Sequence, residues 1–328
     1  MHTVKRFGRR RGAASLRCRP LGWLCLAAIV ACGGTDARAA APRDDVSAAN
    51  EYAAYGRLEP RALRECSGLA ASRRHAGMIW AINDSGNRPE LFAIDPRGRS
   101  LGVFDLRGVE NIDWEDVALD DADHLIVADI GDNDARRREV RLIVVAEPDD
   151  PRQSGAIRTE AVIPFRYEGG PRDAEAIFAW GGELYVIDKQ PLSLLTATTT
   201  LFRVPREAAG SGPPPVAVAV ERYLFAGAVT AADLSADGRT LLVLTYTAVY
   251  LFERPDAASP FFARPPRITR ISCRQAEGAC FLLDGTRDLL IANESRDLFR
   301  IPRPWYESEQ PFAPGWRFIP AAERKAAP

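Results

Sequence analysis

Carboxylate and amide side chains recur at two kinds of position in this chain of 328 residues. Glu115, Glu175 and Glu277 each open a short apolar segment, whereas Asp129 and Asn293 each close one. Such hard oxygen donors are the ligands that Ca²⁺ takes in proteins. The recurrence predicts a divalent cation site built from equivalent positions of a repeated unit. Capping of backbone N–H groups is the structural alternative for the same residue types.

The chain aligns with itself in five segments. A first apolar strand begins near Ser67, Glu115, Glu175, Ala232 and Glu277, and a second ends 13 to 16 residues later, at Asn83, Asp129, Asp188, Thr245 and Asn293. Turn-forming pairs such as Gly181-Gly182 and Asp284-Gly285 separate the two strands. Repeats of about 40 to 50 residues are typical of propellers.

A third strand and an outer fourth strand complete the repeat. The third strands are predicted near residues 91–94, 142–145, 201–204, 249–252 and 297–301, and the outer strands at 101–106, 161–167, 216–225 and 267–273. No segment shows sustained helical periodicity. The pattern predicts an all-β fold, a β-propeller of five four-stranded blades.

The fifth repeat has no outer strand of its own. Residues 52–58 are predicted to fill that place, so that the N- and C-terminal strands close the ring and leave no free edge. Residues 316–319 are the alternative donor, and six blades are the alternative count. The propeller domain is expected to span residues 50–320, followed by a disordered tail at 321–328.

The blade geometry brings the polar positions together. The start of an innermost strand and the end of the next antiparallel strand lie on the same side, here one mouth of the axial channel. So many carboxylates cannot all be ionised there without raised pKa values, basic partners or a bound cation. The predicted metal ligands are Glu65, Asn83, Asp129, Glu175, Asp233 and Glu277. The predicted catalytic residues are Glu115, Asp129 and Lys189, and the other predicted pocket residues are Asp84, Asp113, Asp132, Asp173, Asp188, Tyr246, Asn293 and Glu294.

Lys189 is one of only three lysines, with Lys5 and Lys325, in a chain that otherwise uses arginine. It follows the second strand of the third repeat, and Tyr246 holds the equivalent place in the fourth. An ion pair with a carboxylate is the ordinary role for such a lysine. The alternative role is to orient an anionic ligand, with Tyr246 donating a hydrogen bond.

Histidine chemistry is not expected at this mouth. Apart from His2, the chain has only His75 and His124, and both fall in turns on the opposite face. A Ser-His-Asp triad is therefore excluded there, and no Walker, G-x-S-x-G or H-E-x-x-H motif occurs. Catalysis at this mouth would use a metal-activated water and carboxylates.

The N-terminus has the layout of an export signal. Seven basic residues and no acidic one precede or flank an apolar run at 21–31, so residues 1–31 are predicted to be a signal peptide. The run ends at Cys32 in a lipoprotein-like box, which predicts lipidation of Cys32. Cleavage after Ala39 in an A-x-A motif is the alternative. Residues 32–49 are expected to form a flexible tether.

Export changes the charge. The whole chain carries a formal charge of -1, and loss of the seven basic N-terminal residues leaves -8. This charge disfavours nucleic acid and anionic membrane surfaces as partners, leaves a lipid anchor as the only membrane contact and favours cations. The chain is expected to be a periplasmic or outer-membrane-anchored monomer, or secreted. Three cysteines remain after Cys32, and one disulfide with one free thiol is the simplest expectation for Cys66, Cys273 and Cys280.

Several motifs resemble those of a group of secreted bacterial propeller proteins. They are Glu65-Cys66-Ser67-Gly68-Leu69-Ala70, Asn83-Asp84-Ser85-Gly86, Asp113-Trp114-Glu115-Asp116, Asp129-Ile130-Gly131-Asp132-Asn133 and Thr230-Ala231-Ala232-Asp233. More distantly, the chain is similar to phytase-like or esterase-like propellers and to calcium-dependent lactonases and phosphotriesterases. That resemblance implies that Glu65, Asn83, Asp129 and Asp233 hold a catalytic calcium.

Two functions follow from these observations. The first is an exported propeller that binds a divalent cation, with Ca²⁺ as the expected ion, and hydrolyses a small ester, lactone or phosphoester. The second is a non-enzymatic module that binds a protein or glycan at the cell envelope. Exposed aromatic residues at Trp114, Trp305, Tyr306 and Trp316 would suit the second function.

Overall fold

The computed structural model describes residues 54–189, 198–206, 212–303 and 307. All of them belong to the unit formed by residues 50–328. The predicted signal peptide, Cys32, the tether, the tail, Trp305, Tyr306 and Trp316 lie outside the described residues. A search of the described residues finds no helix with the length and apolar character needed to cross a bilayer.

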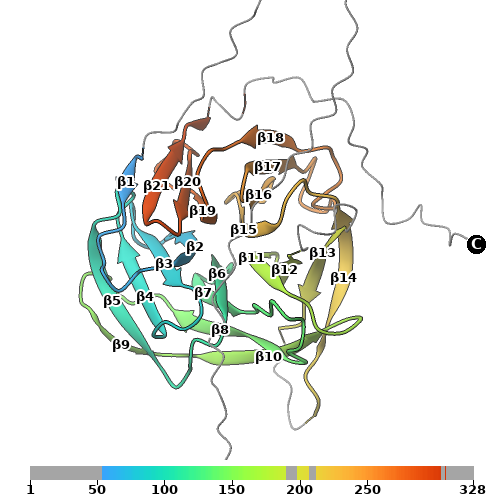
Figure 1. Ribbon diagram of the computed structural model, residues 1–328, viewed down its shortest axis with the longest axis horizontal. Coiled ribbons are helices and arrows are strands. Elements are labelled where there is room, and N and C mark those ends of the chain that lie inside the picture. The colour runs from blue at the N-terminus through green and yellow to red at the C-terminus, as the bar shows by residue number, and fades with distance from the viewer. Residues whose placement is uncertain (1–53, 190–197, 207–211, 304–306, 308–328) are drawn as a thin grey trace, which may run out of the picture. The chain divides into compact units, whose positions relative to one another are not determined.

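The described strands pair in five antiparallel groups, which we call blades 1 to 5 (Figure 1). Blade 1 contains β2 (Cys66–Ala71), β3 (Ile79–Asn83), β4 (Glu90–Ile94) and β5 (Ser100–Arg107). Blade 2 contains β6 (Trp114–Leu119), β7 (His124–Asp129), β8 (Val140–Ala146) and β10 (Ala161–Tyr167). Blade 3 contains β11 (Ala174–Trp180), β12 (Glu183–Asp188), β13 (Thr199–Val204) and β14 (Val216–Tyr223).

Blade 4 contains β15 (Val229–Leu234), β16 (Thr240–Thr245), β17 (Ala248–Glu253) and β18 (Arg267–Arg270). Blade 5 contains β19 (Ala276–Phe281), β20 (Leu289–Asn293), β21 (Asp297–Ile301) and, from the N-terminal side, β1 (Gly56–Arg57). Because β1 pairs with β21, the predicted closure by 52–58 agrees with the structure. The alternative donor at 316–319 lies outside the described residues.

The inner strands β2, β6, β11, β15 and β19 contact one another in that order, and β19 returns to β2 (Figure 1). Inner strands have apolar neighbours on both faces, which explains the unbroken burial of β2. Outer strands such as β5 alternate between buried and exposed residues, because one face meets solvent. The all-β propeller prediction is confirmed. The number of blades in the whole chain stays a prediction, because the strands counted are those of the described residues.

One strand was not predicted. The segment after β8 runs to β9 (Gly155–Arg158), which pairs in parallel with β5 of blade 1, before the chain returns to blade 2 as β10. A second parallel pair joins β10 to β14 of blade 3. These outer pairs tie blades 1, 2 and 3 together at the rim.

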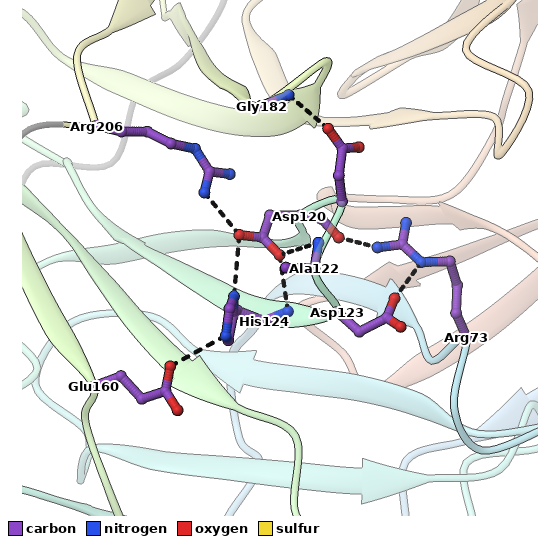
Figure 2. A network of polar contacts seen from close by, with 9 residues as sticks. Arg73, Asp120, Ala122, Asp123, His124, Glu160, Gly182 and Arg206 are labelled. Carbon is purple, nitrogen blue, oxygen red and sulfur yellow. Dashed lines mark hydrogen bonds and ion pairs between the residues drawn. The ribbon is translucent and has the colours of Figure 1, made fainter.

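A polar network joins three blades at the end of the inner strands opposite the acidic residues (Figure 2). The buried Asp120 accepts hydrogen bonds from the Arg206 guanidinium (2.9 Å) and from the backbone N–H of His124 (2.9 Å). The ring nitrogens of His124 face Asp120 at 3.3 Å and Glu160 at 3.2 Å. Arg73 of blade 1 bonds to the Asp120 carbonyl and to Asp123. His75 in its turn and His124 at the start of β7 lie at this end of the inner strands, away from the acidic mouth, and His124 is part of this network.

Two predictions about individual residues were wrong. Cys66, Cys273 and Cys280 are all buried free thiols, so no disulfide forms among them. Burial raises the pKa of the Cys66 thiol and so disfavours the reactive thiolate. Trp114 is fully buried in the core between blades 1 and 2, because it begins an inner strand, and it offers no docking surface.

Candidate functional site

A β-bulge at the same place in every inner strand sets the site. The strand register shifts at one residue in each blade, and these residues are Ser67, Glu115, Glu175, Thr230 and Glu277. A bulge leaves its extra residue out of the ladder and redirects its side chain. Ser67, Glu115, Glu175 and Glu277 line one cavity of about 140 Å³, which we call the acidic cavity.

Half of the sixteen residues predicted for the acidic mouth line this cavity. Its lining includes eight of them: Glu65, Asp84, Glu115, Glu175, Lys189, Tyr246, Glu277 and Glu294. Asp113 and Asp173 adjoin it, since each can bring a carboxylate oxygen within 4.8 Å of one from Glu115. Sequence reasoning gave no role to Cys66 or Asn133 in the lining. Asn133 sits in the polar run that follows β7, and that run was the available signal.

Asp233 was predicted at this mouth and is not there. It lines a second, smaller cavity at the opposite end of the inner strands, with Ala70 and Ala118. Its two carboxylate oxygens accept the N–H groups of Leu234 and Phe281, each at 2.8 Å. The sequence repeat predicts Ala232 as the equivalent position in blade 4, but the bulge lies two residues earlier, at Thr230. A shift of two residues leaves the alternation of side chains between the two faces of a strand unchanged, so the apolar pattern could not reveal the misalignment.

The residues that end the second strands act as caps. Asn83 Oδ1 accepts the N–H groups of Arg64 (2.8 Å) and Glu65 (3.1 Å), and Asn293 Oδ1 accepts that of Asp297 (2.8 Å). Asp188 likewise accepts the N–H of Thr200 at 2.6 Å. The metal role predicted for Asn83 and the pocket role predicted for Asp188 and Asn293 do not match this placement. The backbone N–H groups at the start of a neighbouring strand have no strand partner there, and these side chains satisfy them.

Asp129 was expected to be both a ligand and a catalytic residue, and its carboxylate is fully engaged. Oδ1 pairs with Arg137 Nη2 and Oδ2 with Arg141 Nε, each at 2.8 Å, and the residue is fully buried. Asp132 accepts the N–H groups of Arg136 and Arg137. Both acids therefore hold the loop after β7 in place and leave no oxygen directed to the cavity.

Glu115 differs from the other acids of the cavity. It is 7% exposed, and within the described residues no hydrogen bond or ion pair reaches its carboxylate. Burial, followed by the charge of Glu175 and then that of Asp84, raises the pKa of Glu115 well above its usual range. The Glu115 carboxylate faces the cavity without a donor from the chain, so a cation, a proton or water must compensate its charge.

The acids next to Glu115 also have raised pKa values. Burial raises the pKa values of Asp84, Asp113 and Asp173 above their ordinary range. Each of these three also has donors from the chain. Asp84 accepts hydrogen bonds from the N–H and the side chain of Ser85, Asp113 bonds to the Ser85 side chain, and Asp173 accepts the N–H groups of Asp132 and Ala174.

The other side of the cavity has donors. Lys189 Nζ pairs with Glu175 Oε1, and its ammonium lies 5.5 Å from the centre of the Tyr246 ring. Burial opposes protonation of Lys189, but the charge of Glu175 prevails and raises its pKa. Burial and the neighbouring Glu294 raise the pKa of Glu277 to about 8, against the opposing charge of Lys189. The protonated form of Glu277 is therefore favoured near neutral pH.

Gly131 keeps space for two of the acids. A Cβ atom at this position would overlap Oε1 of Glu115 and approach the Asp113 carboxylate to 2.6 Å. The backbone of the loop after β7 thus approaches both carboxylates closely, as only glycine allows. The loop and the bulge together form a cradle of hard oxygen donors that fits a divalent cation.

Asp116 separates the two cavities. Its buried carboxylate accepts the N–H of Val117 and reaches across the axis to the N–H groups of Ile177 (3.1 Å) and Ala232 (3.3 Å). Burial raises the pKa of Asp116 well above its usual range. Its hydrogen bonds therefore link the three inner strands β6, β11 and β15.

The strand pairing and this pocket define the class of protein, a β-propeller with an acidic axial cavity. No family model matches the chain, and no curated protein matches it by sequence. Among solved structures, a gluconolactonase from Xanthomonas campestris is 14% identical, over 76% of this chain and 88% of that one, with a TM-score of 0.44.

Two further solved structures are similar at the same level. The periplasmic gluconolactonase of Pseudomonas aeruginosa is 14% identical over 72% of this chain and 81% of its own, with a TM-score of 0.41. The PQQ-bound aldose sugar dehydrogenase of Streptomyces coelicolor is 11% identical over 76% and 96%, with a TM-score of 0.45. Two of the three are lactonases, as the distant resemblance indicated. At identities this low, they carry no argument about the site or activity of this chain.

Proposed function

We propose that this chain is an exported propeller that binds a divalent cation in its acidic cavity, with Ca²⁺ as the first candidate, and hydrolyses a small ester, lactone or phosphoester there. The observation that carries the proposal is the unpartnered Glu115 carboxylate, buried at the bulge of β6 and aimed into the cavity. Asp84 and Asp113 complete a set of three oxygen donors around it. Oxygen donors of this kind favour Ca²⁺ over softer metals.

The residues that line the cavity would have different roles in the proposed reaction. A divalent cation would supply Lewis acidity toward a carbonyl or phosphoryl oxygen. Lys189 and Tyr246, on the opposite side, offer donors that would orient an anionic group of the ligand. Glu277, with its pKa of about 8, would hold a proton for a departing alkoxide.

Isothermal titration calorimetry with CaCl₂, MgCl₂ and MnCl₂ tests the binding. The native chain is expected to bind one of these ions and to melt at a higher temperature in its presence. Glu115→Gln is expected to lower the affinity at least about 10-fold, since it removes a charged ligand. Asp134→Asn, which alters an exposed acid on the same loop, is the matched control and should bind as the native chain does. An absence of heat and of thermal shift with all three ions would refute the proposal.

Turnover is tested with a panel of γ- and δ-lactones, aryl esters and phosphoesters. Activity is expected to require the bound ion, to disappear in Glu115→Gln and to fall in Glu277→Gln, which cannot give up a proton. Ion binding without turnover on any of these substrates would restrict the proposal to a binding function.

Export is supported by the basic N-terminus and the apolar run that ends at Cys32. Mass spectrometry of protein recovered from a bacterial host distinguishes lipidated Cys32 from an N-terminus at Ala40. Recovery of a chain that still begins with Met1 would contradict export.

A further inference from the structure

The carboxylates of the acidic cavity form two overlapping sets that share Glu115. One consists of Asp84, Asp113 and Glu115, and the other of Glu115, Asp173 and Glu175. Within each set, one oxygen per residue lies within 4.8 Å of the others. Two oxygen sets around one bridging carboxylate are the arrangement of a centre for two cations, whose ions typically lie about 3.5–4 Å apart.

The two sets differ in how their charge is compensated. Lys189 Nζ binds Glu175 Oε1 in the second set, and the two side chains are only 17% and 6% exposed. Within the described residues, no lysine or arginine forms an ion pair with Asp84, Asp113 or Glu115 of the first set. The closest candidate, Arg137, binds Asp129 and the carbonyl of Gly131 instead. One carboxylate of the second set, Glu175, is therefore already paired with a cation of the chain, and no carboxylate of the first set is.

We propose that Lys189 is a tethered cation that takes the place of a second ion by neutralising Glu175, so that the cavity binds one divalent ion, held by Asp84, Asp113 and Glu115. The inference rests on the cation binding proposed above and assigns the stoichiometry of that site to one residue. An ammonium group suits the position, because it is a compact charge with three donors that can face several carboxylate oxygens.

The sequence agrees with this assignment. Lys189 is the only lysine between Lys5 and Lys325, whereas 40 of the 43 basic residues are arginines. The planar guanidinium of arginine has a fixed fork geometry and cannot act as a point charge between carboxylates. Tyr246 lies beside the ammonium, whose nitrogen is 5.5 Å from the centre of its ring.

Metal stoichiometry tests the proposal directly. The full chain is dialysed to equilibrium against CaCl₂, and the bound metal is measured by mass spectrometry and by calorimetry. The native chain is expected to bind one ion.

Lys189→Met, which preserves length but removes the charge, is expected to bind a second ion at Glu175 and Asp173. The double variant Lys189→Met with Glu175→Gln should return to one ion, and Lys189→Arg, which keeps the charge, should stay at one. Thermal melting of each variant without metal confirms that it is folded.

The outcomes separate this inference from the function proposed above. If the native chain and the folded Lys189→Met variant each bind one ion with the same affinity, the proposed role of Lys189 is overturned. The proposed cation site is then unaffected. Two ions in the native chain would also overturn it. No ion in the native chain but one or more in Lys189→Met would support the role of Lys189 and contradict cation binding by the native protein. No ion in either chain would overturn both.

Discussion

At the scale of single residues, position relative to a strand decides what an acid does in this protein. Acids at the end of a second strand lie beside a turn with unsatisfied N–H groups and become caps, as Asp188 does with Thr200. Acids at the bulge of an inner strand are directed into the channel, where Glu115 has no donor. The same residue type is therefore structural in one register and available to a ligand in the other.

Gly131→Ala is predicted to weaken the cation site without unfolding the protein. The new methyl group would overlap the Glu115 and Asp113 carboxylates, which are the movable ends of side chains, so the ligands shift and the backbone does not. Affinity for Ca²⁺, measured by calorimetry, is expected to fall about 10-fold or more, equal to about 1.4 kcal/mol. Gly155→Ala is the control, since nothing lies within 4 Å of its added Cβ. Equal affinity in Gly131→Ala and the native chain would show that these carboxylates do not hold the ion.

At the scale of elements, each blade depends on the polar residue that ends its second strand. Asn83 ties β3 to the entry of β2 through two backbone N–H groups, and its own amide donates to the Ala62 carbonyl at 2.8 Å. Thr245 has the same place in blade 4, where its hydroxyl accepts the N–H of Ala248. The side chain that closes one strand thus fixes the approach of the next element, and with it the position of the bulge.

Asn83→Ala is predicted to lower the free energy of unfolding by about 1–3 kcal/mol, because it leaves partly buried backbone donors without acceptors. Urea denaturation followed by circular dichroism measures the loss. The exposed Asn133, truncated to alanine in the same way, should change stability by less than about 0.5 kcal/mol. A similar small change in Asn83→Ala would mean that water replaces the cap.

At the scale of the whole ring, the blades are joined by side chains that cross the axis as well as by the closing strand. Asp116 reaches β11 and β15, and Asp233 reaches the N–H of Phe281 on β19. The pairing of β1 with β21 brings the N-terminal side of the domain into blade 5, and Leu58 beside it is fully buried. Stability of the ring therefore depends on carboxyl groups held near its centre.

The protein is predicted to lose stability as pH rises from about 4 to about 7, in part because of Asp233. Burial raises the pKa of Asp233 to about 7 in the folded chain, above its ordinary value of 3.8. The folded state therefore holds a proton that the unfolded chain releases in this range. The stabilisation is complete below pH 3.8 and is lost as pH rises through 7.

Urea denaturation at pH 5 and pH 8 measures this contribution. The native chain is expected to lose about 3 kcal/mol of unfolding free energy to Asp233 over this interval, at about 1.4 kcal/mol per pH unit between pH 5 and the folded pKa of about 7. Asp233→Asn cannot titrate and should lose less, although an amide has one acceptor fewer for the N–H groups of Leu234 and Phe281. Asp149→Asn, at a side chain that is 98% exposed, should follow the native chain. An identical pH dependence in Asp233→Asn would place the titrating group elsewhere.

The sequence by itself determined the repeat, the propeller and the polar mouth, because apolar alternation, turn residues and repeat length are local properties of the chain. It located the bulge residues Glu115, Glu175 and Glu277 and their shared cavity. It could not distinguish a cap from a ligand, since the backbone donors that reach Asn83 and Asp129, and do not reach Glu115, are brought there by the fold. It also placed Asp233 at the wrong end, because a slip of two residues keeps a strand's alternation. Only the tertiary structure fixed that register and showed which carboxylate lies in the cavity without a partner, because both depend on contacts between strands that are distant in the sequence.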